Sequence, residues 1–406
     1  PMIFVGTCPG ERPWLGPDGR ETRTGGIPQT IQRGASNAYF ASLVSSILIP
    51  PYSARVQQVL DRPDIWDEIQ SVPMVEGRPH EPFLRTKARN LGLDPDAFVG
   101  AVLGRLSAAA QPEESDGEVI SEERYRFDEY QAYVGPRPPA QERHDFDTKR
   151  LDVGMYADWF AELFDAVVLV QRLRETRVLT GFSRIVPPGA SGGALAKLSL
   201  DEKPWLPGFS VRGEGIFLQL SQAALAEWSG REDVQHRTAT MQQRLDRLAA
   251  DRGQQRRGII PSTVLMHTLA HLMIRQLAYE CGYDASSIRE RLYVSPAPET
   301  MMAGLLLYTA SGDSEGTLGG LVRQGEPGRL DNTLLAALRN ASICSSDPLC
   351  MESDGQGTHA LNLAACHACA LLPETSCEEG NLLLDRVMVL GGSDKPEIGY
   401  FASVPV

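Results

Sequence analysis

The sequence predicts a mixed α/β protein (α+β) with a loop-rich C-terminal segment. Apolar residues recur with helical spacing over residues 56–110. Residues 164–179 are rich in Val and Leu, and the apolar runs at 215–220 and 302–309 are typical of strands. Five cysteines lie in the last quarter of the chain, where regular apolar patterns are sparse.

Composition and charge place the chain among ordinary globular proteins. It has 406 residues, of which 42% are hydrophobic and 22% charged. The longest apolar stretches, 39–51 and 164–170, are shorter than the roughly 20 residues needed to cross a bilayer. Residues 1–6 lack the basic start, apolar stretch and small-residue cleavage site of a secretory signal. We therefore expect a cytoplasmic protein without a membrane span. The net charge of −13 excludes a surface that is basic all over, so any contact with DNA must be local.

The first 149 residues predict a partly helical N-terminal region. No helix or strand is predicted before Cys8. Such a start is typical of a chain that continues an upstream segment. The apolar run 43–49 ends at Pro50-Pro51, and the helical residues 56–110 follow. Residues 111–123 and 135–149 have the composition of linkers or exposed loops. We place the boundary between two domains here, as 1–149 and 150–406.

The region 150–406 predicts strands followed by helices. Residues 215–220 predict a short strand, and 221–229 and 233–251 predict helices. A buried helix is expected over 262–279, with Ser262 as its N-cap. The apolar run 302–309 predicts a buried strand, and 331–341 a further helix.

Five clustered cysteines form the strongest chemical signal. They are Cys344, Cys350, Cys366, Cys369 and Cys377. Structural zinc takes four thiolate or imidazole ligands, and a Cys-x2-Cys turn supplies two of them. The spacing predicts one Zn²⁺ on Cys366, Cys369 and Cys377, with Cys344 or Cys350 completing the set and His367 as an alternative ligand. Because four protein ligands leave no position for substrate, the site is expected to be structural and not catalytic.

A second pair of metal-ligand types is His267-x3-His271. Residues four apart lie on one face of a helix, but Thr268 occupies the position where a metalloprotease has its glutamate. The favoured interpretation is two buried or hydrogen-bonded histidines in a packed helix.

Two further patterns are weaker. The glycine-rich run 312–320 follows a strand but lacks the Gly-Lys-Ser/Thr ending of a nucleotide-binding loop, so tight turning explains it best. Two groups of arginines predict either a DNA-phosphate contact or a solvated surface. They are Arg237, Arg244, Arg247, Arg252, Arg256 and Arg257, and the smaller group Arg172, Arg174 and Arg177.

Three C-terminal segments carry a family resemblance. They are 267–293, 305–321 and 344–386, of which 364–386 is the most specific. They resemble the zinc-binding module found behind superfamily 2 DNA helicases of the MrfA kind. The upstream segments 32–40, 181–185 and 213–217 extend the resemblance to the DrmB family of the DISARM anti-phage system. The resemblance implies a helicase partner (DrmA-like), a role at phage DNA and an upstream zinc motif at Cys8, although no second cysteine follows within Glu11 to Arg33.

The sequence therefore predicts a non-catalytic subunit with a structural zinc site. Its partners are expected to be a helicase, which would carry the ATPase activity, and DNA. The alternative is a hydrolase or nuclease whose site is not visible as a linear motif, because catalytic carboxylates can come together from distant positions.

Overall fold

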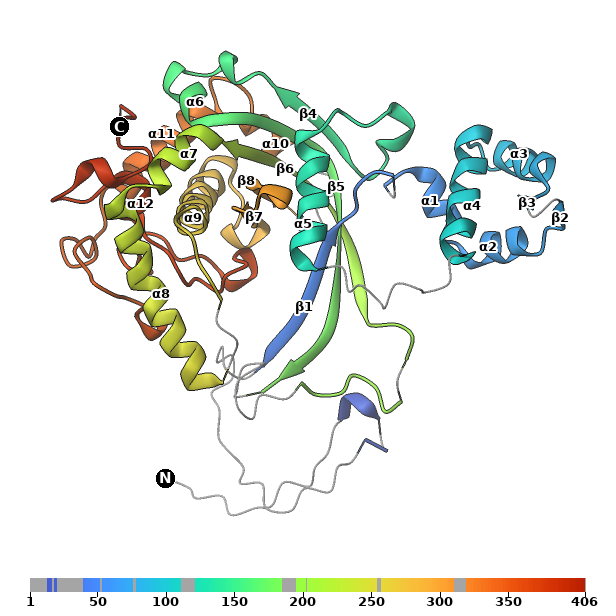
Figure 1. Cartoon of the computed structure of the whole chain (residues 1–406), viewed down its shortest axis with the longest axis horizontal. Helices are drawn as coiled ribbons and strands as arrows, with labels where there is room; N and C mark the ends of the chain where they lie inside the picture. Colours follow the sequence, from blue (N-terminus) through green and yellow to red (C-terminus); the bar gives the residue numbers. More distant parts are fainter. Residues whose placement is uncertain are drawn as a thin grey trace. The chain divides into compact units, whose positions relative to one another are not determined.

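The computed structural model describes most of the chain (Figure 1). The described residues are 13–16, 18–19, 39–51, 53–75, 78–110, 121–184, 195–201, 203–253, 257–309 and 319–405. Residue contacts divide the chain into two compact units. The first comprises Pro1–Ser46, Thr176–Ser210 and Gln242–Gly258, and the second comprises Ile47–Glu175, Val211–Met241 and Ile259–Val406. The predicted boundary between residues 149 and 150 stays a prediction.

Four short helices in the second unit form a bundle with its own core (Figure 1). They are α1 (Arg55–Leu60), α2 (Pro63–Gln70), α3 (Glu81–Asn90) and α4 (Pro95–Ala110), with the hairpin β2 (Met74–Val75) and β3 (Arg78–Pro79). Their buried side chains are Leu60, Ile65, Ile69, Leu84, Ala88, Phe98, Val99 and Val102. The helical pattern predicted over 56–110 is confirmed.

A six-stranded sheet has the order β1-β5-β6-β8-β7, with β4 paired to β5. The strands are β1 (Phe40–Ile47), β4 (Asp147–Leu151), β5 (Phe164–Ser183), β6 (Gly208–Leu220), β7 (Ile288–Ser295) and β8 (Met302–Thr309). The pairs β4–β5, β6–β8 and β7–β8 are antiparallel. All eight residues of β8 are buried, so the strand predicted over 302–309 is confirmed. The strand predicted over 215–220 is the buried end of the longer β6.

In the first unit, the end of β5 makes side-chain contacts with the start of β1 and with Trp14. The hydroxyl of Thr180 donates to the carbonyl oxygen of Ser42 at 3.0 Å. The ring of Trp14 packs edge-on against Phe182 at 5.1 Å between centroids.

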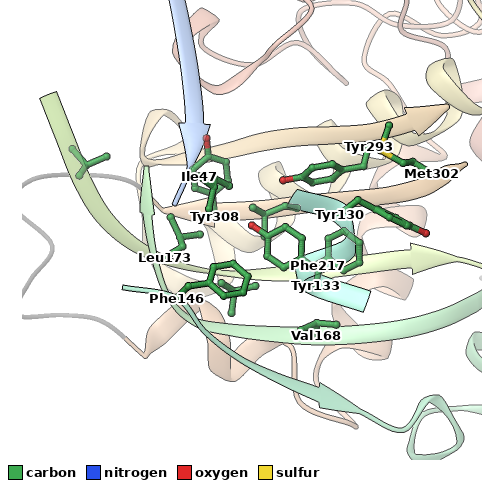
Figure 2. Close-up of a cluster of buried hydrophobic side chains, with 13 residues drawn as sticks. Ile47, Tyr130, Tyr133, Phe146, Val168, Leu173, Phe217, Tyr293, Met302 and Tyr308 are labelled. Carbon is green, nitrogen blue, oxygen red and sulfur yellow. The ribbon is translucent and has the colours of Figure 1, made fainter. Parts of the chain in front are cut away.

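In the second unit, α5 (Glu122–Val134) covers one face of the sheet (Figure 2). Its Tyr133 stacks on Phe217 of β6 with 4.8 Å between ring centroids, and Tyr130 packs edge-on against the same ring. The helix begins after Ser121, whose hydroxyl accepts from the Arg124 amide. The sequence gives little sign of this helix, because its aromatic and charged residues are spread around the helix instead of forming one apolar stripe.

A buried ion pair joins α5 to β7. The Arg291 guanidinium donates to both carboxylate oxygens of Glu129 at 2.7 and 2.8 Å. The Tyr293 hydroxyl donates to the same carboxylate at 3.0 Å, and the Ile47 amide at 2.8 Å. A buried charge is tolerated only when it is paired and hydrogen-bonded. This carboxylate therefore fixes the position of α5 on the sheet.

The opposite face of the sheet is covered by α9 (Pro261–Cys281), which is buried from Pro261 to Leu277 except at Thr263 and Arg275. Successive side chains of a strand point to opposite faces, and Glu290 of β7 accordingly faces α9 while Arg291 faces α5. The predicted buried helix is confirmed, but its predicted cap is wrong. Ser262 lies inside the helix, because Pro261 occupies the first turn, where its fixed φ is already helical.

The remaining chain consists of further helices and loops. The helices are α6 (Asp158–Leu163), α7 (Gln222–Ser229), α8 (Glu232–Arg252), α10 (Gly320–Gln324), α11 (Leu330–Ala341) and α12 (Arg386–Leu390). The helices predicted at 221–229, 233–251 and 331–341 are thus confirmed. Between α11 and α12 the chain has only loops and single turns, which confirms the loop-rich C-terminal segment. In the described part of the chain, no helix has the length and apolarity needed to span a membrane.

The Glu129–Arg291 pair yields a stability prediction. Glu129→Gln keeps the shape but removes the charge that compensates Arg291, so we expect a loss of about 3 kcal/mol in the free energy of unfolding. Glu81→Gln, at the exposed pair with Arg85, is the matched control and should leave the urea midpoint unchanged. Equal midpoints for both variants would contradict the structural role of the buried pair.

Candidate metal centre

Four cysteines from three separate segments meet after α11, and we call them the four-cysteine cluster. They are Cys344, Cys350, Cys366 and Cys369. Cys344 follows the end of α11, and Cys350 lies in the turn after it. Cys366 and Cys369 belong to one tight turn, in which the Cys369 and Ala370 amides donate to the Cys366 carbonyl at 3.2 and 3.0 Å. The turn places both thiols on the same side.

The sulfur positions have the dimensions of a tetrahedral zinc site. The Sγ–Sγ distances are 3.5 Å for Cys344–Cys366, 3.7 Å for Cys350–Cys369 and 3.8 Å for Cys366–Cys369. With zinc–sulfur bonds of about 2.3 Å, the edge of a regular tetrahedron is about 3.8 Å. The four-cysteine cluster therefore fits a structural zinc ion.

Hydrogen bonds around the four-cysteine cluster favour thiolates. The Ser346 amide donates to Cys344 Sγ at 3.4 Å, and the Cys366 amide donates to Cys369 Sγ at 3.2 Å. Burial raises the pKa of Cys366, but hydrogen bonds from Cys344 and from backbone amides outweigh it and lower that pKa to about 7. Burial raises the pKa of Cys350 and of Cys369.

A buried arginine holds the cysteine-bearing segments together. Arg386 has no exposed side-chain surface. Its guanidinium donates to the carbonyls of Ala341 and Ala364 at 2.6 and 3.1 Å, to Asp347 Oδ1 at 3.0 Å and to Cys350 Sγ at 3.4 Å. The Asp347 carboxylate in turn accepts from the amide of Cys344 at 2.7 Å. This arginine thus contacts segments on both sides of the four-cysteine cluster.

Cys377 does not join the other cysteines. It lies with His267, His271 and Glu290 in a second group, which we call the mixed cluster. Cys377 Sγ is 3.1 Å from His267 Nε2, and Glu290 Oε1 is 3.3 Å from the same nitrogen. The expected set of five cysteines is therefore divided between two places. His367, the alternative ligand, is exposed and belongs to neither group.

The mixed cluster is electrostatically coupled. Burial lowers the pKa of His267, but Glu290 and Cys377 outweigh burial and raise it above its usual value. Burial raises the pKa of Glu290, and the two histidines reverse this and hold it well below its usual range. Both histidines are buried, as the sequence predicts. The acidic neighbour that the sequence does not reveal is Glu290, at an inward-facing position of β7.

Other expected sites have different outcomes. Cys8, Arg256 and the glycine-rich run up to residue 318 lie outside the described residues. Arg237 is paired with the buried carboxylate of Asp385, with Nη2 and Oδ1 3.0 Å apart, so it holds α8 against the segment before α12. Arg172 and Arg174 both face buried aspartates.

Comparison with known proteins agrees with this geometry. Residues 269–370 match the family model described as the MrfA Zn-binding domain. The matched region contains all of the four-cysteine cluster and ends before Cys377. The chain is also 32% identical over 385 residues to DISARM protein DrmB of Bacillus paralicheniformis, a match that covers 91% of this chain. This chain is a relative of DrmB.

The match spans 66% of the length of that DrmB. A solved structure, that of the DUF1998 helicase MrfA bound to DNA, has 10% identity and a TM-score of 0.27, and covers 55% of this chain and 23% of that chain. A TM-score this low does not establish a shared overall fold. The resemblance to DrmB and to the MrfA zinc-binding module is therefore confirmed by sequence, and structural zinc is the cofactor that the four-cysteine cluster fits.

Ligation by the four-cysteine cluster predicts a change in metal content. Cys366→Ser/Cys369→Ser should lose one zinc equivalent per chain, because two of four thiolates are removed. Cys281→Ser, which changes a cysteine outside both clusters, is the matched control and should keep its zinc. The test is the zinc content per chain of each purified variant. An unchanged zinc content in the double variant would refute the assignment of the four cysteines as ligands.

The lowered pKa of Cys366 predicts selective reactivity after zinc removal. With a pKa of about 7, Cys366 is roughly half thiolate at pH 7, whereas the raised pKa values keep Cys350 and Cys369 protonated. After mild chelation, iodoacetamide should alkylate Cys366 before Cys350 and Cys369, and the alkylation rate of Cys366 should fall as the pH drops below 7. Mass spectrometry measures the order, and equal rates at the three cysteines would contradict it.

Proposed function

We propose that this chain is a non-catalytic accessory subunit of a bacterial anti-phage defence complex. It binds a superfamily 2 helicase of the DrmA kind in the cytoplasm and helps that helicase engage DNA. The observation that carries the proposal is the relationship to DrmB over 91% of the chain. The match to a zinc-binding domain named for MrfA supports the connection to helicases.

The sequence supports a division of labour between subunits. It contains no Gly-Lys-Ser or Gly-Lys-Thr, the ending of the nucleotide-triphosphate loop that helicase motors use. We propose that the partner hydrolyses ATP and that this chain contributes binding surface. Such a surface must be local, given the net charge of −13.

Five arginines in the second unit supply a local positive surface, and we call them the arginine cluster. They are Arg137, Arg143, Arg172, Arg174 and Arg212. They come from β5, from β6 and from the segment between α5 and β4. Asp147 lies 2.9 Å from Arg137 and 3.5 Å from Arg172, and Asp145 lies 3.2 Å from Arg174. Five cations thus surround two carboxylates.

The two aspartates orient the arginines toward solvent. Side-chain exposure is 0% for Asp145 and 10% for Asp147, but 51% for Arg172 and 48% for Arg212. A guanidinium has five N–H donors, so an arginine whose side chain is half exposed can pair within the protein and also donate to a phosphate. Pre-oriented arginines lose less side-chain entropy on binding. We propose that the arginine cluster contacts the DNA backbone.

Association with the helicase is tested by co-purification. The tagged chain should retain the helicase encoded beside it, and the complex should bind DNA more tightly than either subunit, with an affinity that falls as salt rises. Failure to associate contradicts the helicase role. Association without any change in DNA affinity indicates a scaffold that does not touch DNA.

The arginine cluster predicts a salt effect in the complex. Arg172→Gln/Arg212→Gln should weaken DNA binding. The slope of the logarithm of the DNA-binding constant against the logarithm of the salt concentration should become smaller, by about 1 for each phosphate that an arginine no longer neutralises. The control Arg62→Gln/Arg85→Gln removes the same charge from the α1–α4 bundle and should leave the slope unchanged. Equal slopes for the two double variants would exclude the arginine cluster as the DNA contact.

The rival function, a hydrolase or nuclease, has one observation in its favour. The mixed cluster contains two histidines and a glutamate, a ligand set found in catalytic zinc sites. Catalysis needs an open coordination position, however, and here Cys377 occupies the fourth position around buried side chains. Cleavage of DNA by the purified chain with added divalent metal, abolished by Glu290→Gln, would support the rival.

A further inference from the structure

The mixed cluster is assembled from three separate segments. His267 and His271 lie one turn apart on α9, and Glu290 comes from the neighbouring strand β7. Cys377 follows the turn Glu374–Ser376, and the Ser376 hydroxyl fixes that turn by donating to the Ala285 carbonyl at 2.8 Å. All four candidate ligand atoms lie within 4.8 Å of one another.

The distances between the ligand atoms are those of tetrahedral coordination. His267 Nε2 is 3.1 Å from Cys377 Sγ and 3.3 Å from Glu290 Oε1, and His271 Nε2 is 3.6 Å from the same carboxylate oxygen. Zinc bonds of about 2.0–2.3 Å to nitrogen, oxygen and sulfur require edges of about 3.3–3.7 Å. Two of the three distances lie in this range, and the third, from His267 Nε2 to Cys377 Sγ, is slightly shorter. One ion among the four atoms therefore requires only a small movement of the Cys377 thiol.

Hydrogen bonding leaves lone pairs directed into the mixed cluster. The carbonyl of Ala370 lies 2.8 Å from His271 Nδ1, and because a carbonyl can only accept, Nδ1 carries the proton. In neutral His271, Nε2 then presents a lone pair toward a carboxylate oxygen, which also only accepts. His271 Nε2 and Glu290 Oε2 are buried without a hydrogen bond. His271 Nε2 and Glu290 Oε1 are 3.6 Å apart, and two such acceptors in a dry site need either a metal ion between them or a proton on the imidazole.

The surroundings support an anionic ligand pair. The Asn381 amide donates to Cys377 Sγ at 3.2 Å, and the Glu378 amide donates to Glu290 Oε1 at 3.0 Å. A thiolate, a carboxylate and two neutral imidazoles carry a charge of about −2, which one divalent cation neutralises. A metal-ligating histidine typically donates its other N–H to a backbone carbonyl, as His271 does.

We propose that the mixed cluster binds a second zinc ion. One sulfur, two nitrogens and one oxygen form a set that zinc accepts. His267 and His271 have no exposed surface and Glu290 has 1%, and four protein ligands leave no open position. The second ion is therefore structural. It connects α9, β7 and the chain around Cys377. The four-cysteine cluster has no ligand in any of these three segments.

The two centres are adjacent in the chain. Ala370, which accepts from His271, directly follows Cys369 of the four-cysteine cluster. The two centres therefore share this short segment, while each ion has its own four ligands. The alternative that must be distinguished is a metal-free site, in which protonated histidines neutralise Glu290 and Cys377.

Metal analysis of the intact chain is the first test. The proposal expects two zinc equivalents in the unaltered chain, one in Cys377→Ser, one in Cys366→Ser/Cys369→Ser and none in the triple variant. Cys281→Ser is the matched control and should keep two. One equivalent in the unaltered chain, or an unchanged content in Cys377→Ser, would overturn the proposal. This result is independent of helicase or DNA binding.

A second measurement covers the case in which Cys377→Ser does not fold. Zinc K-edge absorption of the unaltered chain reports the average ligand set. Two occupied centres give five sulfurs and three nitrogen or oxygen atoms per two zinc ions, or about 2.5 sulfurs per zinc. Zinc in the four-cysteine cluster alone gives four sulfurs per zinc and no nitrogen, which would overturn the proposal without any substitution.

Discussion

The burial of Arg386 is the constraint on which the C-terminal module depends. A guanidinium with no exposed surface is stable only if its donors are satisfied. Its partners lie at the last residue of α11, in the Asp347–Cys350 turn and just before Cys366. These are the segments that carry the four cysteines. A chain with only loops and single turns between α11 and α12 lacks the regular pairing that would otherwise hold those segments. The arginine and the four-cysteine cluster together take the place of a larger apolar core.

Local sequence was sufficient where one short pattern determines the structure. The apolar run of β8 and the helical pattern of α9 depend mainly on neighbouring residues, and both were predictable. The Cys-x2-Cys turn was equally informative. The position of Cys377 was harder to predict. It is close to Cys369 in the sequence, but the turn between the two cysteines places Cys377 beside α9. Glu290 gave no local signal, since its role arises from pairing of β7 in the sheet and from packing of α9 on that sheet.

The same reasoning applies to charge. Arg172 and Arg174 stood out in the sequence as a local group, but the surface that they belong to also draws on Arg137 and Arg212 from other elements. What unites these side chains is a pair of buried aspartates, and their effect is visible only in three dimensions. By contrast, Arg237, which sequence grouped with possible DNA contacts, is used internally against Asp385. The Arg237 side chain is 25% exposed and that of Arg172 is 51% exposed, a difference that their spacing in the sequence does not reveal.

Metal and buried charge thus fix the C-terminal segment internally, while a separate basic surface faces outward. Because the loops between α11 and α12 have so little regular pairing, their order should depend on bound metal. Anomalous diffraction at the zinc edge, from crystals of the chain, measures this directly. We expect one peak about 2.3 Å from each sulfur of the four-cysteine cluster and a second peak within the mixed cluster. Absence of a peak among the four cysteines would contradict a metal-organised segment.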